Sequence, residues 1–229
     1  MYLGLLVIIL SKLCIEVYVM KKLAVFDFDS TLMDGETIDF FAEVLGFKEQ
    51  VVAITERAMA GELDFYASLI ERVALLKGLP ESKVDEICRS LPMMPGAKEV
   101  VSGLKDRGYT VVCFSGGFRA ATKPACEKLG IDADFSNFLH AEEGILTGDV
   151  GGEMMYSNAK GDMITRLQAL LDVDRTATLV VGDGANDLSM FAHADTRVAF
   201  CGKPVLKEAA THCIDEKDLT QILEIVDNI

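Results

Sequence analysis

Short apolar runs alternate with amphipathic stretches along the chain from residue 21 onward. Four of the apolar runs have the length of a strand, and each ends in a turn-rich segment: residues 23–26, 110–114, 177–181 and 197–200. Four other stretches place apolar residues three and four apart, as one face of a helix does: residues 97–107, 119–129, 160–171 and 188–194. Strands that alternate with helices predict an α/β fold, in which helices cover the faces of a parallel sheet.

Residues 36–91 interrupt this alternation. Helical periodicity recurs there in four successive stretches, and no convincing strand separates them. A glycine or a proline stands where these helices would end: Gly46, Gly61, Gly78 and Pro80. We therefore expect a small helical insertion, residues 35–91, that leaves the core after the first strand and returns near Pro92. The core then comprises residues 21–34 and 92–229.

A β-hairpin is expected in residues 138–154. Glu143 and Gly144 supply its turn, between two arms that can both be extended. The sequence contains no internal repeat and no low-complexity segment, and no linker is long enough to indicate independent domains.

The first 20 residues differ in character from the rest. Their apolar run has no cationic stretch before it and no small-residue cleavage site after it, so a secretory signal fits poorly. A membrane-spanning helix here would be short, and Lys12 and Glu16 would each cost on the order of 2.5–3.5 kcal/mol near its centre. We expect an N-terminal hydrophobic extension, favour Met20 as the start of the natural protein, and leave a peripheral membrane or packing role open.

The composition is that of a globular protein, with half of the residues apolar and a quarter charged. The formal net charge of −14 argues against a nucleic acid or an anionic membrane as principal partner. A small anionic substrate remains compatible, because a bound divalent cation can reverse the local sign of charge. The six cysteines are scattered, which favours reduced thiols and a cytoplasmic location. A zinc site of Cys201, His212 and Cys213 is not favoured, because the spacing fits no standard pattern.

Two carboxylates, Asp27 and Asp29, follow the first predicted strand. Being two residues apart, they would point to the same side of an extended chain. Such carboxylates repel each other unless one is protonated or a cation joins them, and a divalent ion with oxygen ligands is a natural solution. Either acid could then act as a nucleophile or a proton carrier. A plain turn at residues 29–31 is the open alternative.

Three further groups of residues could carry chemistry. Ser115–Gly117 follow the second strand, where a hydroxyl and backbone N–H groups at the start of a helix could hold an anion; an ordinary turn is the alternative. Asp183 and Asp187, with Asn186 beside them, follow the third strand and offer oxygen ligands for a cation. Lys160 opens a helix and matters only if it faces these groups. Because ligands gather outside the carboxyl ends of parallel strands, the sequence predicts one shared site.

The stretches "DFDST", "SGG", a downstream lysine and "GDGAND", in that order, resemble the haloacid dehalogenase-like phosphatases. The stretches "ETID", "AMAGELDF", "SLIERVALLKGL" and "GYTVVCFSGGF" resemble the members of that family that act on phosphoserine. The resemblance runs from about residue 21 to the C-terminus and leaves the first 19 residues outside. It implies a Rossmann-like parallel-sheet core, a helical cap inserted after the first strand, and a phosphatase that depends on Mg²⁺.

The resemblance also implies roles for the acidic residues. Asp27 would attack phosphorus and form an aspartyl-phosphate, and Asp29 would act first as general acid and then as base. Protonation of a serine alkoxide in the transition state commonly contributes about 10²–10⁴-fold. Mg²⁺ would be held by the Asp27 carboxylate, the Asp29 backbone carbonyl and Asp183, with Asp187 assisting through water or Lys160.

The substrate-binding residues implied by the resemblance lie in both the core and the cap. Those of the core would hold the phosphoryl oxygens or support the substrate: Ser115, the Gly116 N–H, Lys160 and Asn186. In the cap, Glu36 would bind the serine ammonium and Arg72 its carboxylate, while Met59 and Phe65 would form an apolar wall. Without the resemblance, a helix-surface charge near Glu71 and Ser68 is the favoured interpretation of Arg72, and the two apolar residues could simply be cap core.

The activity implied is the Mg²⁺-dependent hydrolysis of O-phospho-L-serine to L-serine and phosphate, the final step of serine biosynthesis. Two alternatives stay open: a related phosphatase or phosphotransferase for another small phosphate monoester, and a non-enzymatic phosphoaspartyl switch module. Asp29 argues against the switch, because a switch needs no general acid beside its nucleophile. The absence of tryptophan and of an evident base-stacking aromatic pair argues against a nucleotide substrate. Oligomeric state is left undefined by the sequence.

Overall fold

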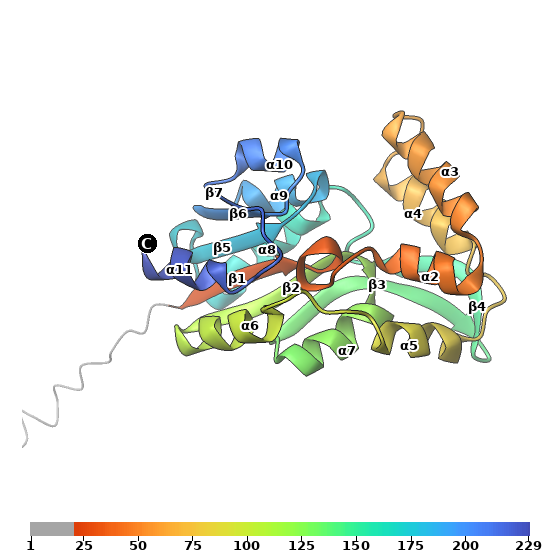
Figure 1. Cartoon of the computed structure of the whole chain (residues 1–229), viewed down its shortest axis with the longest axis horizontal. Helices are drawn as coiled ribbons and strands as arrows, with labels where there is room; N and C mark the ends of the chain where they lie inside the picture. The colour runs from red at the N-terminus through yellow and green to blue at the C-terminus, as the bar shows by residue number, and fades with distance from the viewer. Residues whose placement is uncertain (1–20) are drawn as a thin grey trace, which may run out of the picture.

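A seven-stranded sheet forms the centre of the computed structural model, which describes residues 21–229 (Figure 1). The strand order is β4-β3-β2-β1-β5-β6-β7, and every neighbouring pair is parallel except β3 and β4. The strands are β1 (Lys22–Asp27), β2 (Tyr109–Phe118), β3 (Ala133–Glu142), β4 (Ile145–Gly152), β5 (Thr178–Gly182), β6 (Thr196–Phe200) and β7 (His212–Ile214). The predicted α/β fold is confirmed.

Both faces of the central strand are buried, as its nearly continuous apolar sequence requires. Ala24 and Phe26 belong to one apolar cluster, which α6 (Ala97–Asp106), α7 (Arg119–Leu129) and α11 (Gln221–Asp227) cover. Leu23 and Val25 point to the opposite face and join a second cluster. That cluster is covered by α8 (Ala159–Leu171), α9 (Leu188–Phe191) and α10 (Pro204–Ala209).

Four helices lie between β1 and α6, as the periodicity of residues 36–91 predicts. They are α2 (Thr37–Leu45), α3 (Lys48–Met59), α4 (Phe65–Ala74) and α5 (Glu81–Arg89). In Figure 1, α3 and α4 stand off the sheet at one end, whereas α5 lies beside α7. Buried residues of α2 and α5, such as Phe41 and Ile87, join the apolar cluster of the sheet. Val51 of α3 and Val73 of α4 belong to the same cluster, so these two helices are also joined to the core.

The segment that contains Ser115, Gly116 and Gly117 differs from its prediction. The sequence suggested that the strand ends at Phe114 and that these three residues turn into a helix; instead β2 continues to Phe118. The pairing of β2 with β3 is irregular over these residues, and α7 begins only at Arg119. Small residues allow a turn but do not require one. Here the strand continues through them, and because glycine has no side chain, the backbone at the end of the strand is left uncovered.

The hairpin prediction is confirmed at its turn. Glu143 and Gly144 both have positive φ angles, 51° and 77°, as a tight two-residue hairpin turn requires. The first arm is longer than predicted, because β3 begins at Ala133 and pairs parallel with β2 before it turns.

Three shorter helical segments complete the described chain: η1 (Phe28–Leu32), η2 (Arg175–Ala177) and η3 (Ala185–Asp187). None of the helices in residues 21–229 is both long and apolar enough to cross a bilayer. The cysteines of this part of the chain, Cys88, Cys113, Cys126, Cys201 and Cys213, are unpaired. The predictions for residues 1–20 lie outside the described residues.

Candidate active site

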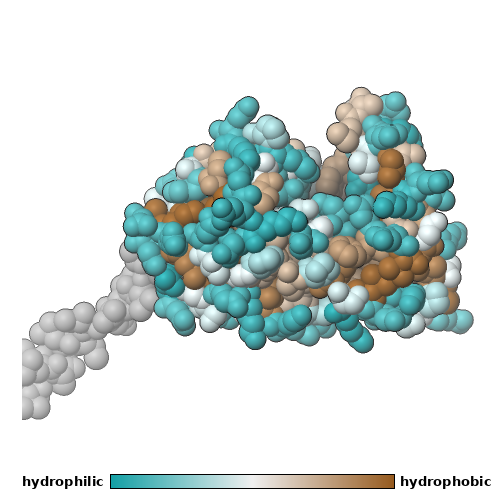
Figure 2. Space-filling view, in the orientation of Figure 1, coloured by the Kyte–Doolittle hydropathy of each residue, from teal (hydrophilic) through white to brown (hydrophobic). Residues whose placement is uncertain are grey.

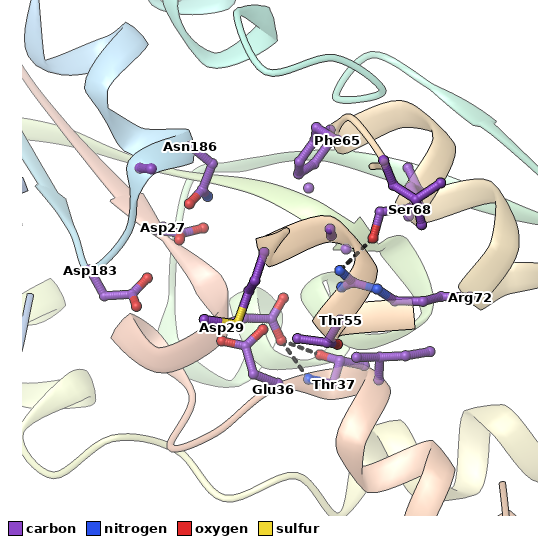
Figure 3. A pocket seen from close by; sticks show the side chains of 18 of the residues that line it. Asp27, Asp29, Glu36, Thr37, Thr55, Phe65, Ser68, Arg72, Asp183 and Asn186 are labelled. Atoms are coloured by element: carbon purple, nitrogen blue, oxygen red, sulfur yellow. Dashed lines mark hydrogen bonds between the residues drawn. The ribbon is translucent and has the colours of Figure 1, made fainter. Parts of the chain in front are cut away.

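A cavity of about 440 Å³ lies where the ends of β1, β2 and β5 meet α2, α3 and α4 (Figure 3). It contains most of the predicted site residues: Asp27, Asp29, Glu36, Met59, Phe65, Arg72, Gly116, Asp183 and Asn186. β1 lies between β2 and β5 in the sheet, so three loops of distant sequence converge at one edge. The prediction that these groups share one site is confirmed.

Lys160 lies beneath this cavity and joins two carboxylates. Its Nζ atom is 2.6 Å from Oδ1 of Asp27 and 2.6 Å from Oδ1 of Asp187, and all three side chains are buried. Burial alone would lower the pKa of Lys160, but the negative charges of Asp187 and Asp27 outweigh it and raise that pKa. Lys160 therefore remains positively charged. It contacts Asp27 and Asp187, which is the condition that the sequence analysis set for a functional role of this lysine.

The "GDGAND" loop owes its shape to the Asp187 carboxylate. Oδ2 of Asp187 accepts the backbone N–H groups of Asp183 and Gly184, each at 3.0 Å. A side chain at Gly182 would bring its Cβ within 2.3 Å of the same oxygen, so only glycine fits there. With Lys160 on Oδ1, both oxygens of Asp187 are engaged within the protein. This carboxylate chiefly organises the loop and orients Lys160.

Asp27, Asp183 and Asp187 form the one cluster among the described residues that could hold a cation. Each contributes a carboxylate oxygen, and these atoms lie within 4.8 Å of one another. Burial and then the charge of Asp187 raise the pKa of both Asp27 and Asp183, although Lys160 partly offsets the shift at Asp27. The Lys160 ammonium and the Phe28 N–H both contact Oδ1 of Asp27. Within residues 21–229, no hydrogen-bond donor contacts the other carboxylate oxygen, Oδ2. Buried oxygen ligands with excess negative charge fit a hard divalent cation.

Asp29 has a different environment from Asp27. It lies in η1, beyond the end of β1, and not on the strand itself. Its Oδ1 accepts the Thr37 backbone N–H at 2.7 Å and the Thr37 hydroxyl at 2.6 Å, and its Oδ2 lies 3.4 Å from Oγ of Ser115. Burial raises the pKa of Asp29, and the two bonds from Thr37 partly oppose that shift. The two acids thus reach one cavity, but only Asp27 contacts Lys160.

Gly116 and Gly117 bring open backbone into the cavity. A Cβ at Gly116 would lie 2.7 Å from Cζ of Phe65, and one at Gly117 would lie 2.9 Å from Oδ2 of Asp29. Ser115 is fully buried, and its Oγ accepts the Gly117 N–H at 2.9 Å. The expected helix N-terminus is absent here, but backbone at the end of β2 borders the space between Phe65 and Asp29.

The inserted segment contributes one acid and one base to the cavity, Glu36 just before α2 and Arg72 on α4. Glu36 accepts a hydrogen bond of 2.9 Å from the Ser30 hydroxyl, and burial, followed by the charge of Asp29, raises its pKa to about 7. Arg72 donates from Nη2 to Oγ of Ser68 at 2.7 Å, while its buried Nε has no partner among the described residues. Burial lowers the pKa of Arg72. Arg72 is therefore not paired with Glu71, which instead bonds Arg57.

Met59 and Phe65 occupy different positions in the cavity wall. Phe65 is partly buried over Gly116, whereas Met59 is largely exposed at the rim. The lining residues that the sequence analysis did not name include Thr37 and Lys203. Thr37 lies within the quoted "ETID", but nothing in its residue type indicates a bond to Asp29. Lys203 lies three residues beyond the end of a predicted strand, and that position is the feature of the sequence that could have indicated a place in the site.

The fold and this site define a class of enzyme. The sequence model described as "Hydrolase: haloacid dehalogenase-like hydrolase" matches residues 21–195, and the chain belongs to that family. The predicted family is confirmed. Hydrolases of this family generally use a divalent metal, which agrees with the three-carboxylate cluster.

Individual relatives are similar over nearly their whole length. A curated "Phosphoserine phosphatase" of Wolinella succinogenes is 60% identical over 202 residues, which is 88% of this chain and 98% of that protein. A solved structure described as a substrate-bound phosphoserine phosphatase complex has a TM-score of 0.84 and 47% identity, over 90% of this chain and 98% of the other. A second, described as a phospho-aspartyl intermediate analogue of phosphoserine phosphatase, has the same TM-score and identity over 90% and 99%. The chain is thus a phosphatase by family and by its relatives.

Proposed function

We propose that this protein is an Mg²⁺-dependent phosphatase that hydrolyses O-phospho-L-serine to L-serine and phosphate. The observation that carries the proposal is that an acid and a base of the inserted segment, Glu36 and Arg72, line the same cavity as Asp27. Arg72, with its buried and unpartnered Nε, matches a carboxylate, and Glu36 matches an ammonium. A phosphate monoester that bears both of these groups suits this cavity, and phosphoserine is the smallest common compound of that kind.

Asp27 is the nucleophile in this proposal. One of its carboxylate oxygens attacks phosphorus, the bond from phosphorus to the serine oxygen breaks, and an aspartyl-phosphate forms on Asp27. Oδ1 of Asp27 is bound by Lys160 and the Phe28 N–H, which leaves Oδ2 without a described donor and oriented for attack. Water then attacks the aspartyl-phosphate at phosphorus, which releases phosphate and regenerates the carboxylate.

Asp29 carries the proton in both steps. It donates to the departing serine oxygen and afterwards accepts a proton from the attacking water, so its charge is restored at the end of each cycle. The pKa of Asp29, raised by burial, supports this role, because burial favours the protonated form that a general acid needs. Thr37 and Ser115 hold that carboxyl in place from two sides.

The phosphoryl oxygens are held by the Lys160 ammonium, the backbone N–H groups at Gly116 and the hydroxyl of Ser115, with Asn186 supporting the substrate. Mg²⁺, when bound by Asp27, Asp183 and the Asp29 backbone carbonyl, supplies the charge that lets a phosphate dianion approach these acids. Asp187 assists through Lys160 and through the loop that it orders.

Residues 35–91 act as the cap that selects the substrate, and the remaining described residues act as the catalytic core. Glu36 and Arg72 bind the amino-acid part, while Phe65 and Met59 restrict water at the cavity wall. Five unpaired cysteines support a reducing, cytoplasmic location, where the reaction would complete serine biosynthesis.

The decisive experiment compares three substrates with and without Mg²⁺: phosphoserine, phosphothreonine and p-nitrophenyl phosphate. We expect Mg²⁺-dependent turnover with the highest kcat/KM for phosphoserine. Activity without preference for phosphoserine would refute the substrate assignment and leave a general phosphatase. Turnover that is unaffected by a chelator would refute the role of the metal.

A further inference from the structure

Two exposed tyrosines stack between α4 and the segment before α8. The rings of Tyr66 and Tyr156 have centroids 5.3 Å apart and planes inclined by 10°. Tyr66 is 41% exposed and Tyr156 is 60% exposed, so neither is part of the hydrophobic core. Stacking of this kind joins two elements at the surface without filling the interior between them.

The pair links the two halves of the catalytic cavity. Tyr66 follows Phe65 on α4, the helix that also carries Ser68 and Arg72. Tyr156 lies between β4 and α8, four residues before Lys160. Tyr156 also lines a small second cavity together with Phe65 and Lys160. The stack therefore lies directly behind the residues that hold the two ends of the substrate.

The two ends of α4 are held in different ways. At its C-terminal end, the following turn makes backbone hydrogen bonds to β4: Gly78 N–H to the Leu146 carbonyl at 2.8 Å and Leu146 N–H to the Leu79 carbonyl at 2.9 Å. At its N-terminal end, the Asp64 cap bonds only within α4, to Ala67. Among residues 21–229, no backbone hydrogen bond joins that end to the sheet.

We propose that Tyr66 and Tyr156 are positioning residues for the reaction. Their stack holds the N-terminal end of α4 against the core, so that Phe65 stays over Gly116 and Arg72 keeps its distance from the phosphate site. Neither ring touches the substrate. Because the other end of α4 is anchored through backbone, loss of the stack lets the helix pivot away from Lys160 instead of detaching. This role rests on the proposed function for its kinetic readout only.

Single and double substitutions test the pair: Tyr66→Ala, Tyr156→Ala, both together, and the conservative Tyr66→Phe. An aromatic pair of this type corresponds to roughly a 2- to 10-fold effect. We expect each alanine variant to lower kcat/KM for phosphoserine by that factor, mainly through KM, and the double variant to be no worse than either single one. Tyr66→Phe should retain wild-type values, and p-nitrophenyl phosphate, which has no carboxylate for Arg72, should be affected less. Phe138→Ala, another exposed aromatic residue stacked with Arg119, is the matched control and should change nothing.

Amide hydrogen exchange of residues 65–74 supplies a readout that needs no substrate. Both alanine variants should speed exchange there to the same extent, and the double variant should add nothing. Independent, additive effects of the two substitutions, or wild-type exchange in both, would overturn the positioning role. Coupled exchange in a protein that does not turn over phosphoserine would overturn the proposed function and leave the positioning role intact.

Discussion

At the residue scale, Asp27 and Asp29 differ in what their oxygens contact. Asp27 is bonded to a buried cation, Lys160, whereas Asp29 accepts neutral donors from Thr37 and Ser115. Burial raises the pKa of both carboxyls, and it is partly offset by Lys160 at Asp27 and by the Thr37 bonds at Asp29. Only Asp27 belongs to the three-carboxylate cluster, so a bound divalent cation would hold Asp27 ionised. This asymmetry suits Asp27 to the role of nucleophile and Asp29 to that of proton carrier.

The asymmetry predicts different defects for two variants. Asp27→Asn should abolish turnover of all substrates. Asp29→Asn should slow phosphoserine about 10²–10⁴-fold, because the serine oxygen then leaves without a proton. p-Nitrophenolate needs no proton to leave, so the Asp29 variant should still release it in one rapid, stoichiometric burst and then stall for want of a general base. Stopped-flow absorbance measures the burst, and a burst from the Asp27 variant would contradict the assignment.

Removing the charge of Glu36 is expected to stabilise the folded protein at alkaline pH. Its pKa is about 7 in the folded, metal-free protein and 4.5 as a free side chain. Between these values the folded state binds more protons than the unfolded state, so stability falls as pH rises through this window. Glu36→Gln keeps an acceptor for Ser30 but lacks that loss. We expect about 1–2 kcal/mol more stability at pH 8, below the limit of about 3 kcal/mol that the full shift would give, because water in the cavity screens the charge.

Urea unfolding of the metal-free proteins at pH 5 and pH 8 measures this difference. The variant should be close to wild type at pH 5, where Glu36 is protonated in the folded state and little of the penalty has developed. If the variant and the wild type were equally stable at both pH values, the pKa of Glu36 would not be raised in the folded protein. The same variant should lose affinity for phosphoserine, which would make Glu36 a residue retained for function at a cost in stability.

At the scale of elements, the pattern of apolar residues defined the central strands better than the edges. β1 and β5 are continuous apolar runs and were predicted within a residue or so of their observed bounds. The first half of β3, "ADFSN", has mixed polarity, and its strand character comes from pairing with β2. The "SGG" segment of β2 was predicted as a turn, because glycine tolerates both conformations and only the neighbouring strand decides between them.

The residues of the site also divide into those that the sequence alone could predict and those that depend on the fold. Residues with a specialised chemistry in a motif, such as Asp27 and Asp183, could be predicted because few structural roles place acids at the ends of buried strands. Thr37 and Lys203 could not, because their importance depends on what the fold brings near them. The stacked tyrosines are of the second kind, since they lie 90 residues apart on elements that the sequence does not connect.

The loop after β5 gives a prediction at this scale. Gly182→Ala would place Cβ 2.3 Å from Oδ2 of Asp187, in a buried site with no free room. We expect a loss of about 1–3 kcal/mol of stability and a several-fold higher Mg²⁺ requirement, since the Asp187 carboxylate must move. Gly184→Ala is the matched control, because its Cβ would meet only the movable ends of the Asn186 and Lys203 side chains. Mg²⁺ titration of activity and thermal unfolding measure both effects, and equal Mg²⁺ requirements in the two variants would contradict the argument.

At the scale of the whole molecule, a strongly acidic protein must admit an anionic substrate. The formal net charge is −14, and the face in Figure 2 is largely hydrophilic, with a notch between the lobe of α3 and α4 and the rest of the molecule. The described cavity is lined by more acids than bases, and its two bases are Arg72 and Lys203. Lys160 is already shared between Asp27 and Asp187. Of the cavity's bases, Lys203 is the exposed one, with 65% of its side chain accessible.

We therefore expect the positive charge of Lys203 to assist the capture of the anionic substrate at the cavity. Its Nζ lies 3.7 Å from Oδ2 of Asp183, and its charge opposes the rise in the pKa of Glu36. Lys203→Gln should lower kcat/KM for phosphoserine about 3- to 10-fold at low ionic strength, mainly through KM, and the difference should shrink in about 0.5 M salt. Lys207→Gln is the control: it removes the same charge four residues further on, in α10, but Lys207 pairs with Asp215 outside the cavity. Equal effects of the two substitutions would mean that substrate responds to the net charge of the molecule, whereas a loss confined to Lys203→Gln would locate the attraction at the cavity mouth.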